Sequence, residues 1–198
     1  VKKWKKQIHH LIETYDNGRV IREGIKTVII GKPNAGKSSL LNALMGEERA
    51  IVTDIAGTTR DILRETVQIN GITLNIADTA GIRMTEDMIE QIGVRKAEEQ
   101  MEDADLIIYV VDSSTVLDEN DEKIIKKLDG RKVIILLNKS DLESLTNEYE
   151  IEKRTGNHPV ISVSAKNGEG MDRLEQTLHD MFYDGNISFN DEVYITNL

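Results

Sequence analysis

Short runs of apolar, mostly β-branched residues alternate along the chain with stretches whose apolar residues recur every three or four positions. The apolar runs predict six strands, at residues 27–30, 62–69, 72–77, 106–111, 133–137 and 160–163. The helical spacing predicts a helix that starts near Lys37 and others at residues 90–101, 120–128, 148–153 and 171–182. Strands that alternate with amphipathic helices are typical of an α/β fold with a mainly parallel sheet.

Two of the predicted strands should pair in antiparallel orientation. Asn70 and Gly71 lie between the runs at residues 62–69 and 72–77. An Asn-Gly pair between two apolar runs is the strongest short signal for a tight hairpin. The sequence therefore predicts a six-stranded, mostly parallel sheet with one antiparallel edge strand.

The two ends of the chain do not follow this alternation. Apolar residues at helical spacing from Trp4 to Tyr15 predict a helix that ends near Gly18, and the segment after Tyr183 continues no pattern. Two irregular termini would explain this, but we favour a domain excised from a larger helical structure. The expected divisions are an N-terminal helical stub at residues 1–24, one α/β domain at residues 25–183 and a returning C-terminal stub at residues 184–198.

The composition excludes several classes of function. A chain of 198 residues with 39% hydrophobic and 30% charged residues has room for one buried domain. Its net charge of −10 argues against broad binding of nucleic acid by this chain alone. The sequence has no cysteine, which excludes disulfides and thiol chemistry, and its apolar runs are too short to cross a bilayer. We expect a cytoplasmic protein that does not enter membranes.

A phosphate-binding loop follows the first predicted strand. The sequence GKPNAGKS matches the pattern in which small residues expose backbone N–H groups to a nucleotide phosphate at a helix N-terminus. Lys37 is a candidate catalytic residue because it can reach the β- and γ-phosphate oxygens, and the Ser38 hydroxyl can ligate magnesium. The expected nucleotide contacts of this loop are Gly31, Asn34, Ala35, Gly36, Lys37, Ser38 and Ser39.

The sequence DTAGIR follows the hairpin and raises a question about hydrolysis. Its aspartate can approach magnesium through a water molecule, and its glycine N–H can face the γ-phosphate. Ile82 stands where related nucleotide hydrolases carry the glutamine that orients the attacking water, and an isoleucine cannot bond to water. Either the chain does not hydrolyse its nucleotide or other residues do that work. The expected nucleotide contacts of this turn are Asp78, Thr79, Ala80 and Gly81.

Two later motifs indicate that the base is guanine. The sequence NKSD follows a predicted buried strand, and the Asp141 carboxylate can accept hydrogen bonds from both N1–H and the exocyclic amine of guanine. Adenine has an acceptor at N1 and no amine there, so it would leave the carboxylate unpaired. Lys139 can lay its stem over the base, and Asn138 can tie the neighbouring loops together. The sequence SAK follows the last strand and places the Ala165 N–H to address guanine O6; its residues are Ser164, Ala165 and Lys166.

A polar loop lies between the first helix of the domain and the hairpin. Residues 47–61 contain a glycine and few core residues, as expected of a mobile loop. Thr58 or Thr59 can add a hydroxyl to magnesium and a backbone group to the γ-phosphate. The position of this loop favours a nucleotide-dependent switch. Its expected nucleotide contacts are Thr53, Asp54, Ile55, Ala56, Gly57, Thr58 and Thr59.

The chain resembles the G domain of the MnmE family, also called TrmE, whose members are GTPases involved in modifying the wobble uridine of certain tRNAs. The resemblance covers nearly the whole chain and rests on GRVIREGIKTVIIGKPNAGKSSLLNAL, AIVTDIAGTTRDILRE, DTAGIR, IEQIGVRKA, NKSD and SVSAKNGEG. It implies a Ras-like P-loop GTPase fold that binds GTP and GDP with magnesium. The segments GRVIREG and NDEVYITN are similar to the family's junctions with its helical domain, which would explain both ends.

The resemblance also implies how hydrolysis can proceed without the glutamine. In this family a hydrophobic residue takes that place, and a potassium ion and a glutamate of switch II act instead. Glu90 matches that glutamate, and Thr59 matches the switch I threonine near magnesium. Judged without the resemblance, Glu90 could be an exposed helix residue and Asn34 could simply hold a turn. The residues that match the potassium contacts are Asn34, Thr53, Ile55 and Thr58.

Several partners follow from the resemblance alone. It implies nucleotide-dependent pairing of two G domains, a FAD-containing MnmG partner and tRNA as the eventual substrate. Two alternatives remain at this stage. One is a GTP-dependent binding switch with negligible turnover, which Ile82 alone would suggest, and the other is a ribosome-associated GTPase of a related family. The junction segments favour a tRNA-modification GTPase over the ribosome-associated one.

Overall fold

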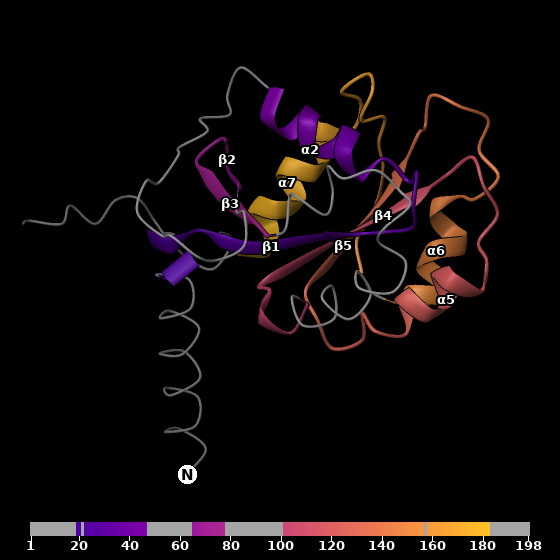
Figure 1. Cartoon of the computed structure of the whole chain (residues 1–198), viewed down its shortest axis with the longest axis horizontal. Helices are drawn as coiled ribbons and strands as arrows, with labels where there is room; N and C mark the ends of the chain where they lie inside the picture. Colours follow the sequence, from indigo (N-terminus) through magenta and orange to yellow (C-terminus); the bar gives the residue numbers. More distant parts are fainter. Residues whose placement is uncertain (1–18, 21, 47–64, 78–100, 157, 183–198) are drawn as a thin grey trace, which may run out of the picture.

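The computed structural model describes residues 19–20, 22–46, 65–77, 101–156 and 158–182. Within these residues the strands are β1 (Ile25–Ile30), β2 (Glu65–Ile69), β3 (Ile72–Ile76), β4 (Leu106–Asp112), β5 (Val133–Asn138) and β6 (Val160–Ser162). The helices are α2 (Lys37–Gly46), α5 (Glu119–Ile125), α6 (Glu148–Thr155) and α7 (Met171–Phe182), as labelled in Figure 1. The predicted stubs, the loop at 47–61 and most of the predicted helix at 90–101 lie outside the described residues.

The six strands form one sheet in the order β2-β3-β1-β4-β5-β6. β2 and β3 pair antiparallel through the turn at Asn70 and Gly71, and every other neighbouring pair is parallel. This confirms the predicted mostly parallel sheet with one antiparallel edge strand. Because β1 lies between β3 and β4, the connections on its two sides diverge at its carboxyl end, which is where open α/β sheets bind ligands.

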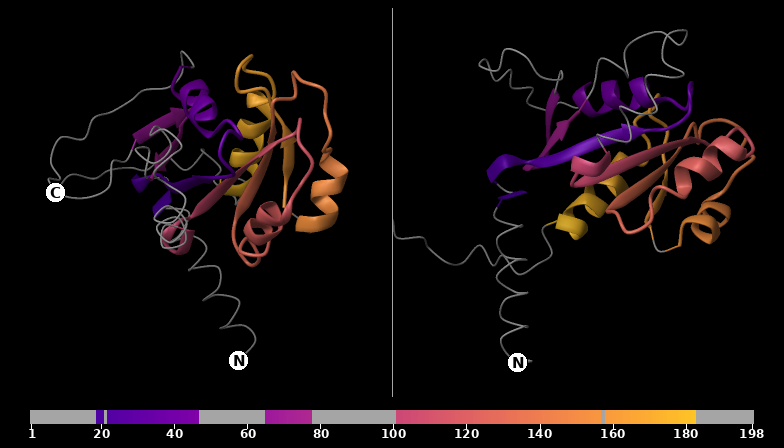
Figure 2. Two further views of the ribbon diagram at one scale, coloured as in Figure 1. Left: turned by 45° about the vertical axis from the view of Figure 1, so that its right-hand side comes forward. Right: turned by 60° about the horizontal axis from the view of Figure 1, so that its bottom comes forward.

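Helices cover both faces of the sheet. On one face α2 and α7 pack through residues such as Leu40 and Leu178, and on the other α5 and α6 pack through Ile125 and Ile151. The α5–α6 pair stays together in all views (Figures 1 and 2). Every residue of β4 and β5 is buried, as expected for parallel strands covered on both sides. The loops that follow these strands are therefore held by a rigid core.

The boundaries of the elements differ from the prediction by a few residues. β1 begins at Ile25 rather than Thr27, and α5 covers Glu119–Ile125 rather than residues 120–128. The helix starts earlier because Asp118 caps its first turn, and it ends earlier because Lys127 and Leu128 donate to carbonyls only three residues back. None of the described helices is long and apolar enough to span a membrane.

Candidate functional site

The phosphate loop connects the end of β1 to the start of α2. Ala35 is buried at the back of this loop, while Asn34, Ser38 and Ser39 are exposed at its front. Asn34 has a φ of 61°, a left-handed conformation that asparagine tolerates better than most residues. The loop thus has a packed back and an open front at the N-terminus of α2, where an anion is favoured.

Lys37 folds back over the phosphate loop. Its ammonium donates to the carbonyl oxygen of Gly31 at 2.9 Å and to that of Lys32 at 2.7 Å. Both acceptors belong to the loop itself, so the ammonium group of Lys37, the first residue of α2, lies close to the carboxyl end of β1. The arrangement places a cation beside the backbone N–H groups of the loop, which is the charge pattern that a phosphate requires.

Asn138 joins the phosphate loop to the loop after β6. Its side-chain nitrogen donates to the Ala35 carbonyl at 2.9 Å, and its side-chain oxygen accepts from the Ala165 N–H at 3.0 Å. Gly36, with a φ of 97°, leaves room for this side chain, because a Cβ there would overlap the Asn138 amide nitrogen. The loops after β1, β5 and β6 are therefore fixed against one another by a single buried amide.

Asp141 is exposed and is oriented by the loop after β6. The Ser164 hydroxyl, which is fully buried, donates to Asp141 Oδ1 at 2.7 Å. The N–H of Ser140 donates to the Val163 carbonyl at 3.1 Å, which fixes the backbone of the same turn. Lys166 is exposed one residue beyond Ala165. The carboxylate and the Ala165 N–H thus lie in adjoining loops at the same edge of the sheet.

Lys139 has a partner that the sequence analysis missed. Its ammonium lies 2.5 Å from Asp112 Oδ2, while Oδ1 accepts from the Ser114 hydroxyl at 2.6 Å and its N–H at 2.9 Å. Burial favours a raised pKa for Asp112, but the bonds from Lys139 and Ser114 outweigh it and the pKa lies below its ordinary value. Asp112 ends β4 directly beside Asn138 of β5. The sequence signal that could have identified Asp112 is an aspartate at the end of an apolar run.

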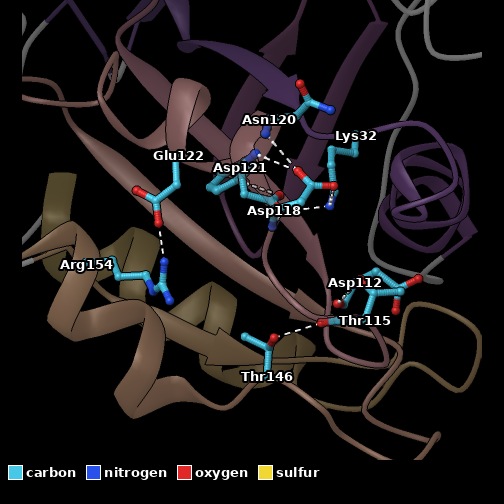
Figure 3. Close-up of polar contacts among 10 residues, drawn as sticks. Lys32, Asp112, Thr115, Asp118, Asn120, Asp121, Glu122, Thr146 and Arg154 are labelled. Atoms are coloured by element: carbon cyan, nitrogen blue, oxygen red, sulfur yellow. Dashed lines mark hydrogen bonds and ion pairs between the residues drawn. The ribbon is translucent and has the colours of Figure 1, made fainter.

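The loops after β4 and β5 are also tied together. The Thr146 hydroxyl donates to the Thr115 carbonyl at 2.8 Å (Figure 3), and the N–H groups of Leu145 and Thr146 both donate to the Ser113 carbonyl. This contact adds the loop after β4 to the set of loops joined by Asn138. Four strand ends, those of β1, β4, β5 and β6, therefore contribute to one surface.

The remaining predicted site residues lie outside the described part of the chain. Within the part that is described, no group of three or more His, Cys, Asp or Glu side chains could hold a metal ion. A magnesium ion at the phosphate loop would instead rely on the hydroxyl of Ser38 and on nucleotide oxygens, a donor set of the hard oxygens that magnesium prefers. The predicted site residues outside the described part are Thr53, Asp54, Ile55, Ala56, Gly57, Thr58, Thr59, Asp78, Thr79, Ala80, Gly81 and Glu90.

The fold and this surface define a P-loop nucleotide-binding protein, with a strand, phosphate loop and helix at the switch point of an open α/β sheet. The chain belongs to the family described as 50S ribosome-binding GTPase, whose profile matches residues 26–139. It is thus a GTPase-family chain, and the matched region ends within NKSD, at Lys139.

Curated relatives carry the name tRNA modification GTPase MnmE. The chain is 56% identical over 193 residues to that of Lachnoclostridium phytofermentans and 50% identical over 193 residues to that of Clostridioides difficile. Each alignment covers 98% of this chain but only 42% of the relative. The resemblance to the G domain of the MnmE family is confirmed, and the chain spans less than half the length of these relatives.

Solved structures show the same fold in other GTPases. A variant of Era from Aquifex aeolicus bound to GDP and AlF4− matches with a TM-score of 0.59 and 29% identity, over 82% of this chain and 58% of that one. The G domain of the FeoB iron transporter of T. maritima matches with a TM-score of 0.56 and 29% identity, over 79% of this chain and 97% of that one. Together with the fold described above, these structures confirm the predicted P-loop GTPase fold.

Proposed function

We propose that this chain is the GTP-binding and GTP-hydrolysing domain of a cytoplasmic tRNA wobble-uridine modification GTPase. The observation that carries the proposal is the bridge made by Asn138, which holds the phosphate loop against the loop of Ala165. The bridge supports a phosphate site and a base site in one surface, because it fixes the two loops against each other. The names of the curated relatives supply the link to tRNA modification.

The described residues support separate roles for the phosphate side and the base side of this surface. The backbone of the phosphate loop and Lys37 hold the β- and γ-phosphates, and Ser38 ligates magnesium, which would neutralise phosphate charge. Asp141 reads the guanine edge, while Lys139 covers the base. The carboxylate suits this role because Ser164 already orients it and because it remains exposed. The Ala165 N–H, which donates to Asn138 Oδ1 in this structure, would share or exchange that bond for one to guanine O6.

Hydrolysis in this proposal uses Glu90 and a potassium ion in place of the missing glutamine. Asn34 supports a potassium contact because its side chain is exposed at the front of the phosphate loop. A cation beside the phosphates would stabilise the charge that develops in the transition state, the task of an arginine finger in other GTPases. The other potassium contacts in this proposal are Thr53, Ile55 and Thr58, and Thr59 joins Ser38 at magnesium.

The proposed partners follow from the same family. Two copies of the domain pair in a nucleotide-dependent way, and the full-length protein acts with an MnmG-type FAD protein on tRNA. The net charge of −10 fits a division in which other parts of the assembly make most contacts to tRNA phosphates.

Single-turnover GTP hydrolysis in potassium chloride and in sodium chloride at matched ionic strength tests the proposed chemistry. We expect faster hydrolysis in potassium, and we expect Glu90→Ala to abolish this acceleration while GTP still binds. Glu152→Ala, an exposed glutamate of α6, is the matched control and should keep the potassium effect.

Equal slow rates in the two salts, unaffected by Glu90→Ala, would contradict potassium-assisted hydrolysis. GTP binding would then survive without turnover, and the chain would be a nucleotide-dependent binding switch, as Ile82 alone suggests. Failure of the unchanged protein to bind GTP or GDP would contradict the proposal as a whole.

A further inference from the structure

Lys32 occupies the first variable position of the phosphate loop, and its side chain reaches α5 (Figure 3). Its ammonium donates to Asp118 Oδ2 at 3.0 Å and to Asp121 Oδ2 at 2.6 Å. Asp118 is the N-cap of α5 and Asp121 lies in its first turn, and they follow Lys32 by 86 and 89 residues in sequence. The phosphate loop is therefore bonded to a helix that the phosphate-loop motif does not include.

Asp121 is a buried carboxylate with donors on several sides. Its side chain is 1% exposed, and Oδ1 accepts from the Tyr109 hydroxyl of β4 at 2.8 Å. Oδ2 accepts from the Asp118 N–H at 2.9 Å in addition to Lys32. Burial and the charge of Asp121 raise the pKa of Tyr109, so the phenol stays protonated and donates. The sheet and the helix cap thus hold this carboxylate in a fixed place.

Lys32 carries the charge that balances this cluster. Burial opposes its charged form, but the hydrogen bonds with Asp121 and Asp118 outweigh burial and raise its pKa. The backbone carbonyl of the same residue accepts from Lys37 at 2.7 Å. One residue therefore joins α5 through its side chain and the phosphate-binding lysine through its backbone.

We propose that Lys32 is a positioning residue of the phosphate site. Its ion pairs with Asp118 and Asp121 fix the start of the phosphate loop, which places the Lys32 carbonyl and, through it, Lys37 against the nucleotide phosphates. The inference rests on the proposed binding of guanine nucleotides at this loop. It assigns a functional consequence to Asp118 and Asp121, which lie outside the phosphate-loop motif.

The test separates positioning from stability with a paired variant. Lys32→Met alone leaves Asp121 without its cation, so it should lower both the stability of the nucleotide-free protein and its affinity for GDP. Lys32→Met combined with Asp121→Asn removes the buried charge together with its partner, so stability should largely return. We expect GDP affinity, measured by calorimetric titration with magnesium, to stay at least about tenfold below the unchanged protein in the paired variant, as for a misplaced binding group.

Two further variants complete the experiment. Lys32→Arg keeps the charge and the donors and should bind GDP nearly as well as the unchanged protein. Lys126→Met removes the same charge from the exposed C-terminal end of α5 and should leave both stability and affinity unchanged. Urea unfolding of the nucleotide-free proteins gives the stability of each variant.

Recovery of GDP affinity in step with stability in the paired variant would overturn the inference, because the cluster would then be structural only. GDP binding by Lys32→Met as tight as that by Lys126→Met would overturn it as well. Failure of the unchanged protein to bind GDP would instead overturn the proposed function on which the inference rests.

Discussion

Asp112 shows how one residue outside a recognised motif can control a residue inside one. Lys139 has a φ of 65° and a long, flexible side chain, so NKSD by itself does not fix where its ammonium lies. The carboxylate of Asp112 does so, because Ser114 orients one of its oxygens and the other bonds to Lys139. The stem of Lys139 is then held in one direction before a base arrives, which lowers the entropy lost on binding.

Replacement of Asp112 by Ala should weaken binding of every base that Lys139 can cover. We expect affinities for GDP and for xanthosine diphosphate to fall together, by about 0.5–1.5 kcal/mol, the typical worth of one hydrogen bond. Asp141→Asn should instead shift preference from guanine toward xanthine, because the amide can donate to the O2 that replaces the amine. Competition binding with both diphosphates measures the two effects.

The exposed aspartate Asp129, replaced by Ala, is the control and should change neither affinity. A changed ratio of GDP to xanthosine diphosphate affinity in Asp112→Ala would contradict a role through Lys139. An unchanged ratio in Asp141→Asn would contradict the assignment of the guanine-reading carboxylate.

At the scale of elements, the sequence predicted which segments form and was less accurate about where they end. α7 was predicted at residues 171–182, where it is found, because its apolar stripe is regular. α5 begins one residue earlier than predicted because its start depends on a capping box between Asp118 and Asp121, a spacing that the apolar pattern does not report. β1 begins two residues earlier than predicted because Ile25 and Lys26 still pair with Leu74 and Asn75 of β3.

Glu148 is the clearest link between α6, β6 and α7. It begins α6, and its Oε1 accepts from the Ser162 hydroxyl at 2.8 Å, from the Ser162 N–H at 2.9 Å and from Arg173 of α7 at 3.2 Å. Glu148→Ala should lower the free energy of unfolding by roughly 1–3 kcal/mol, because β6 loses the acceptor for two donors. Glu150→Ala, in the same first turn of α6 but exposed, should cost less than about 0.5 kcal/mol. Urea unfolding measures the free energy of unfolding of both variants. Equal decreases would show that the α6–β6 link contributes nothing beyond helix propensity.

For the molecule as a whole, the sequence predicted the kind of sheet, and its motifs supplied the residues of the candidate site, whose roles stay predictions. Apolar runs and the Asn-Gly turn are local signals, and so are GKPNAGKS and NKSD. An aspartate at the end of an apolar run points to Asp112, but the sequence contained no local signal that it pairs with Lys139 or that Lys32 pairs with Asp121. Each pair depends on strands becoming neighbours after long connections. Motifs identify residues that meet a ligand, whereas the residues that position them become visible only when the strand order is known.

Long-range ion pairs of this kind also make the stability of the molecule fall at acidic pH. Asp105 joins the chain before β1 to the start of β4, since it pairs with Arg19 at 2.6 Å and accepts from the Lys26 N–H at 3.0 Å. Burial favours a raised pKa for Asp105, but the Arg19 and Lys26 bonds outweigh it, and the pKa lies below the ordinary 3.8. The pKa values of Asp112 and Glu148 are lowered as well.

A carboxyl whose pKa is lower in the folded state stabilises that state at pH values above its ordinary pKa, and this contribution is lost as the pH falls through the lower, folded value. We therefore expect the urea midpoint to fall as the pH drops below 4.5 and 3.8, the ordinary pKa values of glutamate and aspartate, and to keep falling at lower pH. Asp105→Asn should cost about 1.5–3 kcal/mol at pH 7, the worth of a hydrogen bond to a charged group, and less at pH 3. The difference in the free energy of unfolding between the two proteins should shrink as the pH falls. Protonation of Asp105 in the unchanged protein removes the charge that the substitution has already removed. A constant gap from pH 7 to pH 3 would mean that Asp105 acts through packing and not through its charge.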